Sequence, residues 1–352
     1  MKDNYHAIGV MSGSSLDGLD MALVSFTKSD RWNFEFIKGD TLPYTSQWKN
    51  RLMDAQNLCA FDFLLFHKEY GKFIGQNVLE FLDDCEIDCN LISSHGHTIF
   101  HQPDKGVSFQ LGDGYSIAAI TGKTVVSDFR SMDVALGGQG APMVPVGDMF
   151  LFGEYDYCLN LGGFANISYD QNGKRIAYDI CPVNTVINYY ANLKNMEFDR
   201  DGKLANEGRI HKELLFALNN IMFYNSISPK SLGREWLMSE FIPIVENFRI
   251  PVEDKLRTIY EHIAIQVSLS TTFKKQCRIL VSGGGAYNNF LMKLIRKRIN
   301  HTIIVPDENI VDFKEALIFA FLGVLRIRDE INSLASVTGA RQDSIGGITH
   351  RT

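Results

Sequence analysis

Apolar residues recur along this chain at two spacings, one typical of strands and one typical of helices. Apolar runs at 8–11 and 21–26 predict two strands joined by a short polar turn. From Phe66 to Phe81 and from Val252 to Val267, apolar residues return every three or four positions, which predicts two long amphipathic helices. Strands and helices mixed in this way are typical of an α/β protein.

Shorter segments between these elements continue the alternation. Further strands are predicted at 34–37, 91–94, 109–111, 124–127, 157–161, 165–169, 175–178 and 278–281, and further helices at 117–120, 182–190, 288–299 and 316–327. The strand at 175–178 is expected to deliver Asp179 to the tip of a loop. Pro182 is expected in the first turn of the helix that follows.

Both halves of the chain begin with a strand, a glycine-rich turn and a second strand. This repetition predicts a duplication, with two α/β lobes facing each other across a cleft. We expect one lobe to comprise residues 1–135 with 333–352 and the other to comprise residues 136–332. The glycine-rich segment Leu136–Pro142 is the expected hinge.

Composition narrows the class of protein. The chain has 352 residues, 45% of them hydrophobic and 22% charged, and a formal net charge of -6, which is typical of a soluble protein and argues against a nucleic-acid partner. No apolar stretch approaches the roughly 18 residues that would span a membrane, and the polar N-terminus argues against a signal peptide. The six cysteines show no C-x-x-C spacing, so we expect reduced thiols and a cytoplasmic location.

Three glycine-rich turns follow apolar strands, at Ser12–Gly18, Leu161–Gly163 and Ser282–Gly285. Such turns can lay backbone N–H groups against phosphates, because glycine permits positive φ and close backbone approach. Asp17 could hold a hydrated Mg²⁺ beside them. The lysine of a P-loop is absent. Each turn alone could be a plain hairpin turn, but the three together favour ATP binding in a phosphotransferase cleft.

Several acidic residues have two interpretations. Asp179 is either a general base facing the cleft or a turn or helix-capping residue. Asp17 and Asp20 are either magnesium ligands acting through water or turn residues. Glu315 is either a first-turn helix acid or a cleft residue, and its position favours the helix-dipole interpretation.

Two basic groups also leave alternatives open. The histidines in His95-Gly96-His97 alternate as metal ligands can, but no paired cysteine or carboxylate lies nearby in sequence, so a polar contact to sugar or phosphate is favoured over zinc. Arg130 follows a strand end, and it could pair with a substrate carboxylate or anchor Asp133.

Ten ordered motifs match one known family nearly end to end. They are 9–20, 94–98, 110–113, 128–130, 133–142, 160–168, 201–202, 233–235, 282–285 and 336–340. With these motifs the chain resembles the anhydro-N-acetylmuramic acid kinases, which are members of the actin/hexokinase/Hsp70-like superfamily. The resemblance implies an α/β fold of two duplicated, RNase H-like lobes around an ATP cleft.

The resemblance also implies an activity. Such kinases use ATP and Mg²⁺ to open the 1,6-anhydro ring of 1,6-anhydro-N-acetylmuramic acid hydrolytically and to phosphorylate O6. The products are N-acetylmuramic acid 6-phosphate and ADP, and the pathway is cell-wall recycling. The small-molecule sugar and ATP are then the partners, and a homodimer is plausible.

Individual roles follow from matching positions. Asp179 matches the family's catalytic Asp, the base on the water that attacks C1, and Glu315 matches an acid near the active site. The expected ATP-binding residues are Gly13, Ser14, Ser15, Leu16, Asp17, Gly18, Asp20, Gly162, Gly163, Gly283, Gly284 and Gly285. The expected substrate residues are His95, Arg130 and Asn184. Arg130 is chosen for its charge, as the partner of the sugar's lactyl carboxylate, and not from a matching family role.

One segment departs from the family. The family's Asp-Thr-Gly-Pro-Gly-Asn reads Asp179-Ile180-Cys181-Pro182-Val183-Asn184 here, and Asn188 replaces a further Asp. Side chains at Cys181 and Val183 are expected to narrow a loop that lies against the sugar. The outcome is an unchanged reaction with a re-packed loop, a shifted substrate or a weaker enzyme, and retention of Asp179 favours the first.

A smaller departure is His97, where the family commonly has Gln. Two other functions remain open beside the anhydro-sugar kinase. One is a kinase of the same fold acting on another sugar or anhydrosugar. The other is a non-catalytic sensor of nucleotide or muropeptide.

Overall fold

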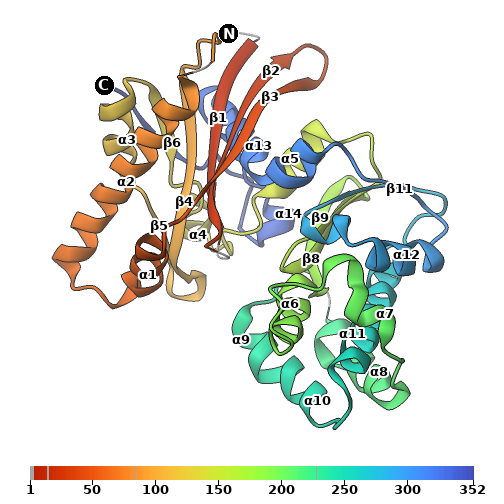
Figure 1. The fold of residues 1–352 in the computed structure, drawn as a ribbon. Helices are drawn as coiled ribbons and strands as arrows, with labels where there is room; N and C mark the ends of the chain where they lie inside the picture. The colour runs from red at the N-terminus through yellow and green to blue at the C-terminus, as the bar shows by residue number, and fades with distance from the viewer. Residues whose placement is uncertain (1–3, 14–15, 84, 227) are drawn as a thin grey trace. The chain divides into compact units, whose positions relative to one another are not determined.

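The computed structural model describes residues 4–13, 16–83, 85–226 and 228–352. The chain forms two compact units, Met1–Phe152 with Phe313–Thr352, and Gly153–Asp312 (Figure 1). These units differ from the expected lobes, because residues 136–152 and 313–332 belong to the first unit. The reason is packing: Phe34 on a strand of the first unit contacts Phe152 edge to face, and Phe313 packs at a tilt against Phe36.

The first unit is built on a twisted sheet with the strand order β12-β6-β4-β1-β2-β3, and β5 also pairs with β4. Strands β1, β2 and β3 form an antiparallel meander, whereas β4 and β6 run parallel to β1. The strands are β1 Asn4–Ser12, β2 Gly18–Lys28, β3 Trp32–Pro43, β4 Leu91–Gln102, β5 Val107–Leu111, β6 Thr124–Ser127 and β12 Ile348–His350.

Helices complete the first unit. They are α1 Ser46–Asp54, α2 Ala60–Leu82, α3 Gly114–Thr121, α4 Ser131–Ala135, α5 Val144–Leu151, α13 Glu308–Ile327 and α14 Ala335–Thr338, of which α13 begins in the second unit. The predicted face of α2 is confirmed, because Phe66, Tyr70 and Ile74 lie in one core with Ile8 and Val10 of β1.

The second unit repeats this strand order. Its sheet is β11-β10-β7-β8-β9, in which β7, β8 and β9 form an antiparallel meander and β10 and β11 run parallel to β7. The strands are β7 Tyr157–Leu161, β8 Phe164–Gln171, β9 Lys174–Pro182, β10 Arg278–Ser282 and β11 Thr302–Ile304. The same order occurs in β6-β4-β1-β2-β3, so the expected duplicated RNase H-like fold is confirmed.

The helices of the second unit surround a large apolar core. They are α6 Asn184–Asn192, α7 Lys203–Glu207, α8 Lys212–Asn219, α9 Arg234–Trp236, α10 Ile242–Glu246, α11 Val252–Ser270 and α12 Asn289–Arg298, with a short 3₁₀ helix, η4, at Met222–Asn225. Ile259 and Ile263 of α11 are fully buried in this core, as the periodicity predicts.

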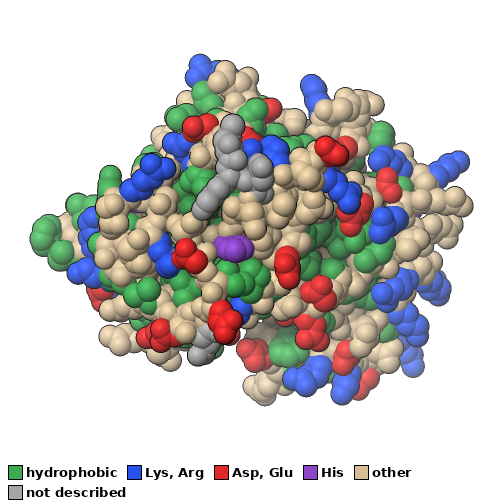
Figure 2. Space-filling view, turned by 90° about the horizontal axis from the view of Figure 1, so that it is seen from above, with side chains coloured by type: hydrophobic (Ala, Val, Ile, Leu, Met, Phe, Trp, Pro, Cys, Tyr) green, Lys and Arg blue, Asp and Glu red, His purple; other side chains and the backbone are tan. Residues whose placement is uncertain are grey.

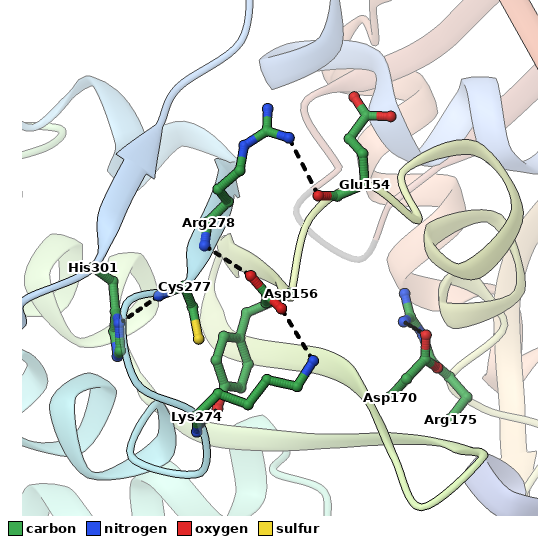
Figure 3. Close-up of polar contacts among 9 residues, drawn as sticks. Glu154, Asp156, Asp170, Arg175, Lys274, Cys277, Arg278 and His301 are labelled. Carbon is green, nitrogen blue, oxygen red and sulfur yellow. Dashed lines mark hydrogen bonds and ion pairs between the residues drawn. The ribbon is translucent and has the colours of Figure 1, made fainter.

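Polar contacts fasten the beginning of β10 to neighbouring strands (Figure 3). Asp156, just before β7, accepts hydrogen bonds from the Arg278 amide and from Lys274, each at 3.0 Å. His301 accepts from the Cys277 amide at 3.1 Å. The glycine-rich turns follow the C-terminal ends of β7 and β10. These contacts therefore hold the two strands at the ends opposite to the turns.

Three further properties of the structure bear on the sequence predictions. In the described part of the chain, no helix is both long enough and apolar enough to cross a membrane. Acidic and basic side chains are intermingled on the face seen in Figure 2, as is usual for a solvated surface. All six cysteines are thiols, as expected.

Candidate active site

The first glycine-rich turn connects β1 to β2 in the first unit. Ser14 and Ser15, two of the predicted ATP-binding residues, lie outside the described residues. Around them the carbonyl of Gly13 accepts a hydrogen bond from the Leu16 amide at 3.2 Å, and Leu16 adopts a positive φ of 58°. The side chain of Asp17 is exposed. Tight geometry and an exposed carboxylate are what the predicted phosphate turn requires.

A buried chain of hydroxyl groups supports this turn. Tyr44 donates to Ser12 Oγ at 2.8 Å, and Ser12 Oγ lies 3.0 Å from His97 Nδ1. Because the Tyr44 proton points to Ser12, Tyr70, at 2.5 Å, donates to Tyr44. Burial lowers the pKa of His97 to about 4, so this imidazole is neutral near pH 7 and accepts from Ser12. Ser12 belongs to the predicted turn Ser12–Gly18, whereas sequence reasoning missed Tyr44, which no motif singles out.

His95 and Arg130 form a second polar pair. His95 Nδ1 lies 2.9 Å from the Gly96 carbonyl, and Nε2 accepts from Arg130 Nε at 3.0 Å and Nη2 at 2.8 Å. Arg130 Nη1 donates to the Gly140 carbonyl at 2.6 Å. Burial and the adjacent guanidinium hold the pKa of His95 well below its usual value, so His95 is a neutral support for the cation. Two of the three predicted substrate residues, His95 and Arg130, are therefore in direct contact.

Asp133 has its own partners. Its buried carboxylate accepts from the Gly140 amide at 2.7 Å, from Ser333 at 2.8 Å and from Thr338 at 2.7 Å. Arg130 acts on Asp133 only through its charge. Asp133 thus ties the expected hinge segment to the C-terminal residues, and the alternative in which Arg130 simply anchors Asp133 is wrong.

Glu315 does not lie in the first turn of a helix. Helix α13 begins at Glu308, about two turns earlier, so the helix-dipole interpretation of Glu315 is wrong. The helix backbone touches β1: a Cβ on Gly9 would lie 1.7 Å from the Ala316 carbonyl oxygen. This approach sets Glu315 beside the strand that leads into the glycine-rich turn.

The charge environment of Glu315 links it to other predicted residues. Its side chain is solvent-accessible yet closely surrounded by protein, and this desolvation raises its pKa. The charge of Arg130 opposes the shift, and the charge of Asp20 adds to it. Asp20 also accepts a hydrogen bond from Thr41 at 2.6 Å. The first unit therefore brings two carboxylates, Asp20 and Glu315, and one guanidinium, Arg130, within electrostatic reach of one another.

The described residues contain no group of three or more His, Cys, Asp or Glu side chains arranged to hold a metal ion. The zinc interpretation of His95 and His97, already disfavoured, gains no support, because His95 contacts Gly96 and Arg130 and His97 contacts Ser12. Mg²⁺ bound through water needs only one or two carboxylates beside phosphates. Asp17 and Asp20 are suitable for that mode of binding.

The predicted glycines of the second unit lie close together. Gly283 has a φ of 80°, and a Cβ there would lie 2.3 Å from Asn160 Oδ1, while one on Gly285 would lie 2.8 Å from the Leu161 carbonyl oxygen. Asn184 donates to the same Leu161 carbonyl at 3.1 Å. The turn after β10 therefore packs on the turn after β7, beside Asn184.

The N-terminus of α6 is occupied by this turn. The Val183 and Thr185 amides donate to the Gly163 carbonyl at 2.9 and 3.2 Å, and the Asn184 amide donates to the Gly162 carbonyl at 3.2 Å. These three N–H groups are therefore not available to a phosphate in this conformation.

Asp179 lies within strand β9 and not at a loop tip, so that expectation is wrong. Asp179 pairs with Asn166 and Cys181 pairs with Ala165, which leaves Ile180 as the extra residue of a β-bulge. Bulges of this kind re-aim side chains and occur next to active sites. Pro182 ends the strand and α6 begins at Asn184, so the expectation of Pro182 in the first helical turn is also wrong.

The carboxyl of Asp179 is half-buried. Its Oδ2 accepts a hydrogen bond from the Leu232 amide at 2.7 Å, and its own amide donates to the Lys230 carbonyl at 3.0 Å. Desolvation raises the pKa of Asp179 to about 6, although the Leu232 hydrogen bond opposes the shift. A carboxylate with such a pKa can accept a proton near neutral pH. Sequence reasoning missed the segment around Lys230, which comes from about fifty residues further along the chain.

The two side chains that replace family glycines do not narrow the loop. Cys181 and Val183 are both 0% exposed and belong to the core of the second unit. Val183 has a φ of -128°, so it needs no left-handed backbone. The expectation that these side chains crowd the sugar is wrong, because both point into the protein.

Comparisons with known proteins were made on the whole chain. The family model described as anhydro-N-acetylmuramic acid kinase matches residues 5–351. The anhydro-N-acetylmuramic acid kinase of Vibrio parahaemolyticus is 35% identical over 99% of both chains, and that of Hydrogenovibrio crunogenus is 31% identical over 97% of both.

Solved structures were compared as well. A ROK family glucokinase from Streptomyces griseus, in complex with glucose and AMPPNP, overlaps with a TM-score of 0.42 at 12% identity, covering 91% of this chain and 99% of that one. The activator of the 2-hydroxyisocaproyl-CoA dehydratase from Clostridium difficile, with bound ADPNP, overlaps with a TM-score of 0.44 at 16% identity, covering 92% and 96%.

Proposed function

The chain belongs to the anhydro-N-acetylmuramic acid kinase family, and from this premise we propose how its own residues carry out the reaction. The protein is an ATP-dependent kinase of 1,6-anhydro-N-acetylmuramic acid that serves peptidoglycan recycling. The reaction joins hydrolysis of the anhydro bond to phosphorylation of the oxygen that hydrolysis releases.

Asp179 is the general base of the hydrolytic step. Its carboxylate takes a proton from a water molecule as the water oxygen bonds to C1 of the sugar. The bond between C1 and O6 breaks, and O6 keeps the electron pair. O6 then attacks the γ-phosphorus of ATP, and ADP leaves with the electrons of the broken P–O bond. The observation that carries this proposal is the half-buried carboxyl of Asp179, whose pKa is raised to about 6.

Arg130 supplies the positive charge for an anionic substrate group. Its Nε and Nη2 lie on His95 and its Nη1 lies on Gly140, so the guanidinium is held rigidly. The lactyl carboxylate of the sugar is the group that fits a fixed guanidinium. His95 acts through Arg130, Asn184 lies beside the glycine turns, and Glu315 assists as a second acid.

The glycine-rich turns bind ATP. Gly13–Asp20 supply donors in the first unit, and Gly162, Gly163 and Gly283–Gly285 supply a glycine surface in the second. Mg²⁺, when bound, neutralises phosphate charge, and Asp17 and Asp20 are the residues that would hold it through water. A homodimer and a cytoplasmic location complete the proposal.

Mass spectrometry of the product tests this function. Purified protein is incubated with ATP, Mg²⁺ and 1,6-anhydro-N-acetylmuramic acid in ¹⁸O-water, beside Asp179→Asn. Glu207→Gln is the matched control, because it removes an exposed carboxylate on α7 of the same unit. We expect a phosphorylated, ring-opened sugar with one ¹⁸O from the wild type and from Glu207→Gln, and none from Asp179→Asn.

Other outcomes are equally informative. Binding of ATP and sugar without product would indicate a sensor and contradict the kinase. Phosphorylation of a different anhydrosugar would keep the chemistry and change the substrate. An Asp179→Asn protein that retains full turnover would assign the base to another residue.

A further inference from the structure

Asp179 is hydrogen-bonded to a segment to which the sequence motifs assign no role. Residues 228–233, called the strap here, lie against β9: the Lys230 carbonyl accepts from the Asp179 amide at 3.0 Å, and the Leu232 amide donates to Asp179 Oδ2 at 2.7 Å. The strap thus forms one hydrogen bond with the backbone of Asp179 and one with its carboxyl group. A backbone N–H directed at a carboxylate stabilises the ionised form.

The side chain of Lys230 fixes the strap. Its Nζ donates to the carbonyls of Phe223 and Tyr224 at 3.2 and 3.4 Å, both in η4. The ammonium also lies 4.7 Å from the centre of the Phe223 ring and 5.5 Å from that of Tyr178. Desolvation by burial lowers the pKa of Lys230 and is the sole cause of that shift. The ammonium group of Lys230 therefore interacts with two helix carbonyls and two aromatic rings.

Helix η4 is itself anchored to the core. The Tyr224 hydroxyl lies 2.9 Å from His262 Nε2, and His262 Nδ1 lies 2.7 Å from Asn219 Oδ1. Burial lowers the pKa of His262 to about 3, so the ring is neutral, donates to Asn219 and accepts from Tyr224. A rigid connection thus runs from α11 through η4 and Lys230 to the carboxyl of Asp179.

We propose that Lys230 is a positioning residue for the reaction: it holds the strap so that the Leu232 amide stays directed at Asp179 and keeps that base ionised and aimed. This inference rests on the proposed role of Asp179 as the base. Lys230 touches no reacting atom in this scheme and acts only through the strap.

Two titratable groups near Asp179 carry no charge near pH 7. One is the Cys181 thiol on β9, which interacts electrostatically with Asp179, and the other is the Tyr224 hydroxyl on η4, which interacts with Cys181. Desolvation raises the pKa of each above its usual value. Asn166, which faces Asp179 from β8, does not titrate. The loss of the Leu232 hydrogen bond should therefore appear directly as a higher pKa of Asp179.

The test compares Lys230→Met with Lys230→Arg, which keeps donors for the two carbonyls. The pKa of Asp179 is read from the ¹³C shift of its carboxyl, assigned by the signal that Asp179→Asn removes. We expect Lys230→Met to raise this pKa by about one unit, a tenfold change in protonation. Lys230→Arg should leave the pKa of Asp179 close to the wild-type value. Lys274→Met, which breaks an ion pair elsewhere in the unit, should leave this pKa unchanged.

Kinetics provide the second measurement. We expect Lys230→Met to lower kcat about tenfold, to leave KM for ATP within about twofold, and to move the acidic limb of the pH profile upward. An unchanged Asp179 pKa in Lys230→Met would overturn the proposal. If Lys230→Met does not fold, Lys230→Gln replaces it, with the same expected direction.

The two proposals fail differently. The carboxyl titration needs no turnover, so a wild-type protein without kinase activity would refute the proposed function and still report on the strap. If Lys230→Met raises the pKa of Asp179 but leaves kcat unchanged, Lys230 supports the hydrogen bond from Leu232 to Asp179, but that bond is not important for the reaction.

Discussion

The carboxyl group of Asp179 lies in a partly apolar environment. One backbone hydrogen bond stabilises its charge, while its neighbours on the strand, Ile180 and Cys181, are buried in the core. Its pKa is raised to about 6 from 3.8, so the folded protein binds a proton there more tightly than the unfolded chain. Between these two pH values the free energy of unfolding falls as pH rises. The ionised base is therefore kept at a cost in stability.

This cost predicts the effect of Asp179→Asn. Asn keeps an oxygen for the Leu232 amide but carries no charge, so we expect it to raise the free energy of unfolding by about 1–2 kcal/mol at pH 8. Near pH 3.5 the site is protonated in the folded wild type and mostly protonated in the unfolded chain, so most of the gain should disappear. Urea unfolding of both proteins at the two pH values measures this. A gain that is equal at both would contradict the charge explanation.

At the scale of elements, strand β9 explains how the chain tolerates its departure from the family pattern. The bulge at Ile180 turns the Cys181 side chain into the core, while Asp179 remains half-buried and accepts from the strap. The family glycine at position 181 is therefore replaced on the core side of the strand. The Cys181 side chain therefore contributes to the packing of the core.

Restoring the glycine tests this division of roles. We expect Cys181→Gly to lower the free energy of unfolding by about 2–3 kcal/mol, because it leaves a cavity and frees the unfolded backbone. We expect kcat/KM to stay within about threefold of the wild type. Thermal unfolding and steady-state kinetics at 25 °C measure the two effects. A marked change in KM for the sugar with unchanged stability would place Cys181 on the substrate side instead.

Helix α13 depends on the absence of a side chain on β1. Gly9→Ala would force a methyl group into the Ala316 carbonyl, so we expect a loss of at least about 3 kcal/mol. Gly106→Ala is the matched control. Position 106 has open space around it, and its φ of 73° should cost only about 1 kcal/mol. Chemical unfolding ranks the two, and equal losses would contradict the contact.

The sequence predicts these elements unevenly, for physical reasons. Periodicity finds α2 because its apolar face is continuous, whereas the first two turns of α13 mix polar and apolar residues and hide its start at Glu308. The glycine turns are evident because several glycines follow apolar strands, and at Gly283 the φ of 80° requires a residue without a side chain. The bulge at Ile180 and the strap at Leu232 depend on pairing between distant segments, which no local pattern records.

At the scale of the molecule, the same strand order occurs twice, and each copy places a glycine turn between its first two strands. Duplication explains why both halves of the chain carry the same strand–turn–strand pattern. It also explains why the boundaries differ from those expected: the first unit takes in residues 313–332, which continue a helix begun in the second.

The first unit is discontinuous, and this predicts the behaviour of a shortened chain. A protein ending at Asp312 lacks most of α13 and all of β12, whereas the second unit, Gly153–Asp312, is intact. We expect hydrogen exchange to show native-like protection across 153–312 and fast exchange across 4–152. Native-like protection of β1 in the shortened chain would contradict this dependence on the C-terminal residues.

The consequence reaches the order of events on the ribosome. Synthesis normally lets the N-terminal domain fold first. Here β1 and β6 must wait for segments made much later, because β1 is covered by α13 and β6 is paired by β12. The inserted second unit can finish while the sheet that surrounds it in sequence is still incomplete. The nascent chain thus exposes the face of β1 that α13 later covers. A chaperone that shields residues 4–43 until α13 has been made would serve this protein more than one acting on the middle of the chain.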